Sequence, residues 1–366
     1  MKIVCDDKIP YIREALAAVA DEVVYKKGSE IKAEDVKDAD VLIVRTRTRC
    51  DAQLLKGSRV QLVATATIGY DHIDTTWLEQ QGIKWVNCPG CNSGSVAQYV
   101  ESVLILLIES GKLKMENDDY QTSTCESLVS NHKSQISNLK SQITLGIVGC
   151  GHVGSKVCRV GERLGMRVLV NDPPLEKSQL SNLKSQIRFV SLDTIARECD
   201  VITFHVPLDA TTHYLADEAF FAKLAKRPVI INSSRGGVVD EQALLRALDA
   251  GRVREAVIDT WENEPDIARA LLNKVYIGTP HIAGYSADGK VNADNMVMEA
   301  LCRHFGLPLP PPIVPPRLEH QPQAQTYTAR ALELYNAMED SRKLKTHPEL
   351  FEELRGDYPL RREKWE

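Results

Sequence analysis

The chain has 366 residues, which is more than one ordinary hydrophobic core needs and favours two or more domains. Its formal net charge is -5 at pH 7, and basic residues are interspersed with acidic ones, which argues against a protein that binds duplex DNA. No apolar run is long enough to cross a bilayer. From the charge distribution and the lack of such a run, we expect neither nucleic acid nor a membrane as partner.

Short β-rich apolar runs alternate with helical patterns in the N-terminal part of the chain. This alternation is typical of a parallel α/β sheet, because parallel strands need a crossover that is usually a helix. We therefore predict a compact N-terminal α/β unit. The expected strands are KIVCD (2–6), VLIVR (41–45), LVATA (62–66) and IKWVNCP (83–89), with helices over 11–20 and 75–82.

A second series of the same kind follows a strongly apolar helix predicted over 95–110. Its six expected strands match the number in a complete dinucleotide-binding sheet. They are TLGIVG (144–149), RVLVND (167–172), VITFH (201–205), VIINSS (229–234), EAVID (255–259) and VYIGT (275–279).

Two copies of the segment SNLKSQI interrupt this second series, at 137–143 and 181–187. Their polar composition favours solvated loops, with a short interaction helix as the alternative, and we interpret both as insertions. After residue 306 the run LPLPPPIVPP predicts a stiff connector, and a charged, mostly helical pattern follows it. That pattern predicts a third, small domain.

The stretch GIVGCGHVGS places Gly149, Gly151 and Gly154 in a G-x-G-x-x-G motif between a predicted strand and a predicted helix. The first glycine allows a tight turn, the second lets backbone amides approach a pyrophosphate, and the third lets the helix pack on the strand. The next predicted strand ends in Asp172, whose carboxylate can bind ribose hydroxyls and would repel a 2′-phosphate. The motif therefore predicts NAD rather than NADP. The alternative is a glycine-rich turn followed by a capping aspartate.

Three polar residues follow three successive predicted strands: Arg235, Glu264 and His281. The carboxyl ends of parallel strands meet at one edge of a sheet, where α/β proteins bind their ligands. Oxidation of an alcohol beside a carboxylate needs a base, which His281 supplies with Glu264 as its partner, and a cation, which Arg235 supplies. Singly, each residue also fits an ordinary strand end, turn or loop. Their common position downstream of a nucleotide motif favours catalysis.

The motifs GCGHVGS, INSSRGGVVDEQAL, IDTWENEP and TPHIAGYS resemble those of the NAD-dependent D-2-hydroxyacid dehydrogenases. The resemblance implies a two-domain α/β fold in which a flavodoxin-like substrate domain accompanies a Rossmann NAD-binding domain, followed by a small helical or α+β C-terminal domain suited to homodimerisation. The expected boundaries are 1–94 and 284–306 for the substrate domain, 95–283 for the NAD-binding domain with insertions near 112–142 and 176–187, and 307–366 for the C-terminal domain.

The resemblance also carries site residues onto this sequence. It implies catalytic roles for Arg235, Glu264 and His281, and substrate contacts for Thr46, Thr67 and Tyr285. Val206 departs from the pattern, since a hydroxyl residue is expected at that position. The implied NAD-binding residues are Gly149, Gly151, His152, Val153, Gly154, Asp172, Val206, Ser233, Ser234, Arg235, Asp259 and Gly284.

In the stretch VLIVRTRTRC, the residues Arg45, Arg47 and Arg49 alternate beyond a predicted strand. If the strand continues, all three side chains share one face and can bind a phosphate dianion. A solvated, salt-bridged edge is an equal alternative. The first reading fits a small phosphorylated 2-hydroxy acid, the kind of substrate that the family resemblance implies.

The nine cysteines and the acidic start, MKIVCDDKIP, are typical of a reduced cytoplasmic protein without a secretion signal. Cys88 and Cys91 have C-x-x-C spacing but no second pair, so we predict no metal site. His72 and His205 are interpreted as structural.

Two alternatives to a dehydrogenase specific for that phosphorylated 2-hydroxy acid remain open. One is a related dehydrogenase acting on 3-phosphoglycerate, glyoxylate or lactate. The other is an NAD-sensing binding protein without catalysis.

Overall fold

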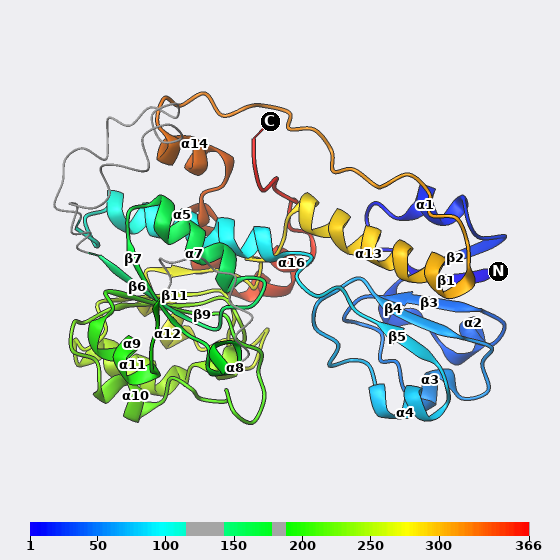
Figure 1. Cartoon of the computed structure of the whole chain (residues 1–366), viewed down its shortest axis with the longest axis horizontal. Helices are drawn as coiled ribbons and strands as arrows, with labels where there is room; N and C mark the ends of the chain where they lie inside the picture. The colour runs from blue at the N-terminus through cyan, green and yellow to red at the C-terminus, as the bar shows by residue number, and fades with distance from the viewer. Residues whose placement is uncertain (115–142, 178–187, 366) are drawn as a thin grey trace. The chain divides into compact units, whose positions relative to one another are not determined.

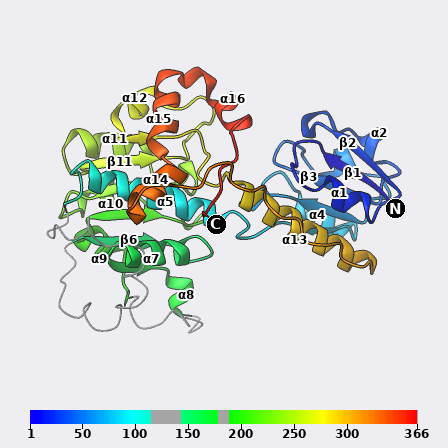
Figure 2. The same cartoon turned by 90° about the horizontal axis from the view of Figure 1, so that it is seen from above.

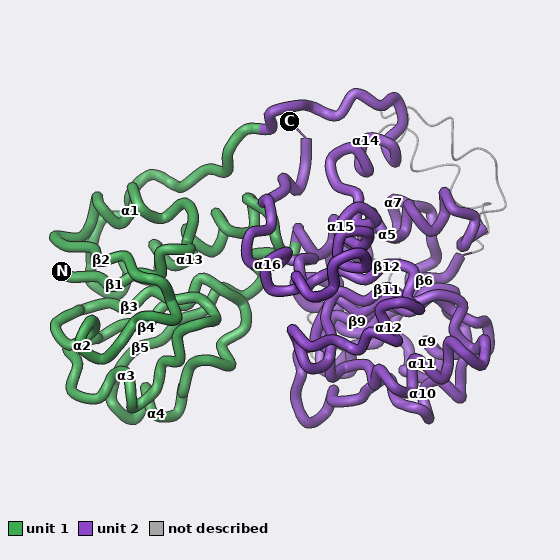
Figure 3. Tube along the Cα trace, turned by 180° about the vertical axis from the view of Figure 1, so that it is seen from behind, with its two compact units in different colours: residues 1–93, 285–317 green, residues 94–284, 318–366 purple. Residues whose placement is uncertain are grey.

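The computed structural model describes residues 1–114, 143–177 and 188–365, and the chain splits into two compact units. Unit 1 comprises Met1–Ser93 and Tyr285–Arg317, and unit 2 comprises Gly94–Gly284 and Leu318–Glu366 (Figures 1 and 3). Apart from Ile143, both SNLKSQI copies lie outside the described residues, so their interpretation stays a prediction.

The sheet of unit 1 has five parallel strands in the order β2-β1-β3-β4-β5. This is the flavodoxin-like order, which agrees with the predicted α/β class. Strand β2 is absent from the sequence prediction because it is an edge strand, with only three apolar residues between charged ends. The strands are β1 (Lys2–Asp6), β2 (Glu22–Lys26), β3 (Val41–Val44), β4 (Leu62–Thr65) and β5 (Lys84–Val86).

Both faces of this sheet are buried, and successive residues alternate between them as strand geometry requires. On β3, Val41 and Ile43 pack in one cluster, while Leu42 and Val44 pack in the other. The first cluster is covered by α1 (Arg13–Ala17) and α13 (Ala287–Phe305), and the second by α2 (Ala33–Val36), α3 (Ala52–Leu55) and α4 (Thr75–Gln80). Helix α13 thus joins unit 1, where the family resemblance expects a returning segment.

The sheet of unit 2 has seven parallel strands in the order β12-β11-β10-β9-β6-β7-β8. In chain order this is the doubly wound arrangement of a dinucleotide-binding domain with one added strand, and its switch point lies between β6 and β9. The prediction missed β8, which has only two residues. The strands are β6 (Thr144–Val148), β7 (Arg167–Asn171), β8 (Arg188–Phe189), β9 (Val201–Phe204), β10 (Val229–Asn232), β11 (Glu255–Ile258) and β12 (Ile277–Gly278).

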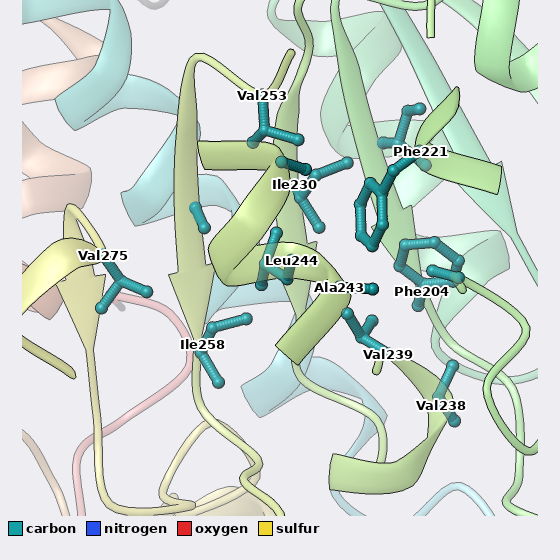
Figure 4. Packing of buried hydrophobic residues seen from close by; sticks show 14 of the residues in the cluster. Phe204, Phe221, Ile230, Val238, Val239, Ala243, Leu244, Val253, Ile258 and Val275 are labelled. Atoms are coloured by element: carbon teal, nitrogen blue, oxygen red, sulfur yellow. The ribbon is translucent and has the colours of Figure 1, made fainter. Parts of the chain in front are cut away.

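The main core of unit 2 lies between one face of this sheet and the helices that cover it, four of which connect its strands. Figure 4 shows Phe204, Phe221, Ile230 and Leu244 meeting in it. Helix α7 (Gly154–Arg163) packs on β6 and β7, α5 is Ser93–Glu109, and α8 (Pro173–Lys177) follows β7. The four core helices are α9 (Leu192–Glu198), α10 (Glu218–Ala222), α11 (Glu241–Asp249) and α12 (Arg269–Lys274).

The C-terminal segment is helical as expected, but it does not form the separate unit predicted over 307–366. It contains α14 (Tyr327–Leu334), α15 (Ala337–Thr346) and α16 (Phe351–Gly356), drawn in orange and red in Figure 2. Leu344 and Phe351 are buried in the main core of unit 2, and the Gly278 N–H of β12 donates to Ser341 Oγ at 3.0 Å. The apolar face of the segment is therefore used within unit 2, while residues up to Arg317 belong to unit 1.

Over the part of the chain that the structure describes, the helices lack the combination of length and apolar character needed to cross a membrane.

Candidate active site

The glycine turn lies between β6 and α7 of unit 2 and is shaped by close backbone approaches. Gly149 has φ +90°, and a Cβ on it would lie 2.6 Å from His205 O. A Cβ on Gly154 would lie 2.0 Å from Gly149 O. A Cβ on Gly151, in contrast, would meet nothing within 4 Å, so the turn is open there. With His152 and Val153 completing the turn before the ten-residue α7, this geometry fits the pyrophosphate of NAD.

Asp172 is held beside this turn at the end of β7. Its Oδ2 accepts from Cys150 N at 2.7 Å, and its Oδ1 accepts from Leu175 N at 2.9 Å. An ionised carboxylate accepts more than two hydrogen bonds, so Asp172 has capacity left for ribose hydroxyls. The described residues therefore fit NAD at both the pyrophosphate and the ribose.

At the end of β9, His205 and Val206 line the same turn. The Nε2 atom of His205 is 2.9 Å from Thr203 Oγ1, and burial lowers the pKa of His205 to about 3. A ring that stays neutral and bonded within the sheet is structural. Val206 presents Cγ1 2.8 Å from where a Cβ on Gly149 would stand, so it forms an apolar wall of the turn.

The loop after β10 carries Ser233, Ser234 and Arg235. The Asn232 side chain organises it: Asn232 Oδ1 accepts from Ser234 Oγ at 2.8 Å, and Asn232 Nδ2 donates to Arg235 O at 2.9 Å. Arg235 is half-buried, and its Nη1 donates to Ser234 O at 2.8 Å. Ser233 Oγ is buried without a hydrogen-bond partner among the described residues.

Gly236 lets this loop approach the loop that follows β11. A Cβ on Gly236 would lie 2.1 Å from Trp261 O, so a side chain is excluded there. The strands β10, β11 and β12 are neighbours in the sheet. The structure therefore brings the loops of Arg235, Glu264 and His281 together at the carboxyl edge of the sheet in unit 2.

Glu264 and His281 form a direct hydrogen-bonded pair. The His281 Nδ1 atom is 2.8 Å from Glu264 Oε2 and 3.1 Å from Oε1, and Trp261 N donates to Oε1 at 2.9 Å. Burial pushes the pKa of Glu264 up, but the hydrogen bonds and charges of His281, Trp261 N and Arg355 outweigh it, so that pKa lies below its usual range. Because an ionised carboxylate only accepts, Nδ1 carries a proton and Nε2 is the basic nitrogen of the neutral ring.

Asp259 holds the loop that carries His281. The backbone of His281 has φ +56°, a left-handed conformation that costs a non-glycine residue roughly 1–3 kcal/mol. Asp259 O accepts from His281 N at 2.8 Å, and its carboxylate accepts from Ile282 N at 2.8 Å and Ala283 N at 3.0 Å. Asp259 is 1% exposed, and burial raises its pKa. The implied role of Asp259 in NAD binding stays a prediction.

Glu241, for which the sequence carried no signal, lies close enough to Glu264 for the two charges to interact. It is 5% exposed, and its Oε1 accepts from Glu262 N at 2.8 Å. Burial raises the pKa of Glu241 to about 7, with the charges of Glu262 and Glu264 acting in the same direction.

We expect Glu241→Gln to remove part of the pH dependence of stability. Between about pH 4.5 and 7 the native state keeps a proton that the unfolded chain has released, so wild-type stability falls as pH rises. Glutamine keeps the hydrogen-bond acceptor and cannot ionise. Urea unfolding should show the variant about 2–3 kcal/mol more stable than wild type at pH 8 and nearly equal at pH 4.5. An equal difference at both pH values would contradict this.

In unit 1 the predicted substrate residues Thr46 and Thr67 follow the ends of β3 and β4. Thr46 is exposed. The Thr67 hydroxyl donates to Gly69 O at 2.9 Å and lies 2.6 Å from Thr65 Oγ1. His72 Nε2 is 3.1 Å from Thr65 Oγ1, and burial lowers the pKa of His72, which fits its structural interpretation. Tyr285 begins the second segment of unit 1.

The predicted common face of Arg45, Arg47 and Arg49 is wrong, because β3 ends at Val44 and the chain then turns. The side chains therefore do not alternate on an extended strand. Arg45 is half-buried, and its Nη1 donates to Lys8 O at 3.3 Å. Arg47 and Arg49 are exposed, and Arg49 Nε pairs with Asp51 Oδ2 at 2.8 Å. Arg45 directly follows the carboxyl end of β3.

Sequence reasoning missed Lys290 on α13, which lies near Arg45. Its Nζ is 4.4 Å from the centroid of the Tyr285 ring. Burial lowers the pKa of Lys290, and the charge of Arg45 acts in the same direction. Burial also raises the pKa of Asp294, four residues further on, to about 7. The available signal was a Lys–Asp pair at i, i+4 spacing on a predicted helix.

Cys88 and Cys91 are buried, and burial raises the pKa of Cys88, whose Sγ donates to Thr65 O at 3.4 Å. The cysteines that the structure describes are free thiols. No group of three or more His, Cys, Asp and Glu side chains is placed to hold a metal ion within residues 1–114, 143–177 and 188–365.

Comparisons with known proteins agree with this geometry. The NAD-binding domain of the D-isomer specific 2-hydroxyacid dehydrogenases matches residues 106–283. The erythronate-4-phosphate dehydrogenase of Bacteroides thetaiotaomicron is 50% identical over 369 residues, which covers 100% of this chain and 97% of the relative. The chain belongs to the erythronate-4-phosphate dehydrogenase family. The member from Porphyromonas gingivalis is 39% identical, over 99% of this chain and 94% of its own length.

Membership of this family confirms the predicted enzyme class and cofactor, an NAD-dependent oxidoreductase. Among solved structures, D-lactate dehydrogenase from Aquifex aeolicus, complexed with NAD and lactic acid, has a TM-score of 0.62 at 25% identity. It covers 84% of this chain and 96% of its own. D-2-hydroxyisocaproate dehydrogenase has a TM-score of 0.64 at 22% identity, over 83% of this chain and 98% of its own, and shares the fold.

Proposed function

We propose that this protein oxidises 4-phospho-D-erythronate at C2 to 2-oxo-3-hydroxy-4-phosphobutanoate, with NAD as acceptor, on the route to pyridoxal 5′-phosphate. The choice of substrate is supported by 50% identity to an erythronate-4-phosphate dehydrogenase over the full chain. The chemistry is supported by one observation above all, the 2.8 Å hydrogen bond between His281 Nδ1 and Glu264 Oε2, in the unit that also carries the nucleotide-binding turn.

In this proposal His281 is the general base. With Nδ1 bonded to Glu264, its Nε2 takes the proton of the substrate's C2 hydroxyl, and the ionised Glu264 stabilises the imidazolium that forms. The C2–H bond breaks at the same time and its electron pair leaves as hydride. NAD supplies the hydride acceptor when bound. The products are the 2-keto acid, NADH and one proton.

Arg235 binds the substrate carboxylate next to the reacting carbon. Its guanidinium offers several N–H donors, of which the structure uses Nη1 for Ser234 O. The permanent charge of Arg235 also stabilises the negative charge that develops on the C2 oxygen. NAD is held by the glycine turn, Asp172, Val206, Ser233, Ser234, Asp259 and Gly284.

The substrate residues of unit 1 complete the proposal. Arg45 and Lys290 are two cations near each other, and they supply the charge that a phosphate dianion needs. Thr46, Thr67 and Tyr285 retain their predicted substrate contacts. Arg47 and Arg49 stay predicted phosphate residues, and Arg49 also pairs with Asp51.

A substrate panel tests this function. Purified protein should reduce NAD when 4-phosphoerythronate is added. The kcat/KM for 4-phosphoerythronate should be at least about 100-fold higher than the kcat/KM for 3-phosphoglycerate or for unphosphorylated D-2-hydroxy acids. A keto-acid acceptor is added in a parallel series to regenerate bound cofactor. Comparable turnover of 3-phosphoglycerate, glyoxylate or lactate analogues would identify another dehydrogenase. NAD binding without turnover of any acid would identify a non-catalytic NAD sensor.

The proposal includes a homodimer located in the cytoplasm. Free thiols among the described cysteines support a reducing compartment. Sedimentation of the full chain measures the oligomeric state.

A further inference from the structure

The C-terminal segment contributes an arginine to the proposed catalytic pair. Arg355 on α16 places Nη1 3.4 Å from Glu264 Oε2, the same oxygen that lies 2.8 Å from His281 Nδ1. The Arg355 and Glu264 side chains are 22% and 16% exposed, so water screens this pair only in part. A second cation at this oxygen favours the ionised carboxylate of Glu264 and restricts its orientation.

A second arginine of the segment binds the backbone directly after His281. Arg361 Nη1 donates to Ile282 O at 3.1 Å, and Nη2 donates to Ala283 O at 2.6 Å. Its Nε donates to Gln98 Oε1 on α5 at 2.9 Å, and its guanidinium lies 3.9 Å from the centroid of the Tyr335 ring. A planar fork with these partners has little freedom to rotate. Arg361 therefore ties the left-handed His281 loop to α5.

The C-terminal segment that carries both arginines is fixed to unit 2 by buried apolar side chains. Phe351, at the start of α16, is 1% exposed in the main core of unit 2, and Leu344 on α15 is 0% exposed. Tyr358 links Arg361 to α15, because its hydroxyl donates to Asp340 Oδ2 at 2.8 Å and accepts from Arg361 Nη1 at 3.2 Å.

We propose that Arg355 and Arg361 are positioning residues for the dehydrogenase reaction, through which the C-terminal segment orients Glu264 and His281. This inference rests on the proposed function of the pair. Neither arginine touches the substrate in this scheme. Arg355 acts on the carboxylate that orients the imidazole, and Arg361 acts on the backbone that carries it.

The charge balance around the pair predicts the direction of the effect. Glu264 faces His281 and Arg355 and is also close to Glu241, while His281 faces Glu264 and the buried Asp259. Removing Arg355 leaves the acidic groups with less positive charge to oppose them. Protonation of the His281–Glu264 pair then becomes easier, and a higher pH is needed to obtain the basic Nε2.

The first test compares Arg355→Met with wild type in the full chain. We expect kcat/KM at pH 7 to fall about 10-fold and the rising limb of its pH profile to move up by about half a pH unit or more, with the Kd for NAD unchanged. Arg355→Lys should restore most of the limb position, because it keeps the charge. The control is Arg342→Met, which removes an exposed arginine of α15 and should match wild type. The proposal for Arg355 is overturned if the rising limb of the pH profile of Arg355→Met coincides with that of wild type. It is also overturned if the affinity for NAD falls by the same factor as kcat/KM.

A second measurement does not depend on turnover. The imidazole of His281 is titrated by NMR in wild type and in Arg355→Met, with the His281→Asn variant used to assign its signal. A higher midpoint in Arg355→Met supports the proposal, and an unchanged midpoint overturns it. If wild type oxidises none of the acids in the panel, the proposed function fails, while this titration still decides the role of Arg355.

Arg361 is tested with lysine, since a buried methionine would leave two backbone carbonyls without donors. Arg361→Lys keeps the charge but loses the fork that holds Ile282 O and Ala283 O. We expect kcat to fall at least about fivefold with the substrate KM and the NAD Kd unchanged. An unaltered kcat overturns the positioning role of Arg361, and so does a loss of NAD affinity that accounts for the whole effect.

Discussion

We expect the His281→Asn variant to lose about 10³-fold in kcat while folding and binding NAD as the wild type does. Asparagine is the informative substitution because the backbone at His281 has φ +56°, a conformation that asparagine tolerates better than most residues. Its Nδ2 can also donate to Glu264, so the carboxylate keeps a partner. What disappears is the basic Nε2, which the proposed reaction needs for the hydroxyl proton.

The control for this variant is His320→Asn, which changes an exposed histidine of unit 2. Turnover is measured with NAD and 4-phosphoerythronate, NAD affinity by titration, and folding by thermal unfolding. A His281→Asn enzyme that keeps a third or more of wild-type kcat would show that another group removes the proton.

The second large effect concerns two glycines of one turn, which we expect to respond in opposite ways. Gly151→Ala should fold normally, because a Cβ there meets nothing within 4 Å. The added methyl occupies the space proposed for the pyrophosphate, so the Kd for NAD should rise about 100-fold, or about 2.7 kcal/mol. Gly154→Ala puts a Cβ 2.0 Å from Gly149 O and should cost roughly 1–3 kcal/mol of folding free energy or more.

Thermal unfolding and NAD titration of both variants separate these effects. We expect Gly151→Ala to have a normal unfolding midpoint and weak NAD binding. We expect Gly154→Ala to have a lowered unfolding midpoint even without NAD. If Gly151→Ala binds NAD with wild-type affinity, the pyrophosphate does not approach the turn at that position.

Local patterns were sufficient for the class of the fold and for the nucleotide turn. Strand propensity and crossover length predict two parallel sheets, and the glycine spacing predicts a turn whose shape depends on residues close in sequence. Strands β2 and β8 escaped prediction because an edge strand buries little apolar surface and β8 has two residues. The prediction that Arg45, Arg47 and Arg49 share one face was wrong because nothing local in the sequence marked the end of β3 at Val44.

The residues around the catalytic pair needed the tertiary structure. The sequence alone determined that Arg235, Glu264 and His281 follow three strand ends, and the parallel register brings those ends to one edge of the sheet. It carried no signal for Arg355 or Arg361. Arg355 meets Glu264 across 91 positions of the chain, and such a contact follows from how helices pack on a core rather than from any local propensity. The tertiary structure therefore decided which charges surround the proposed base.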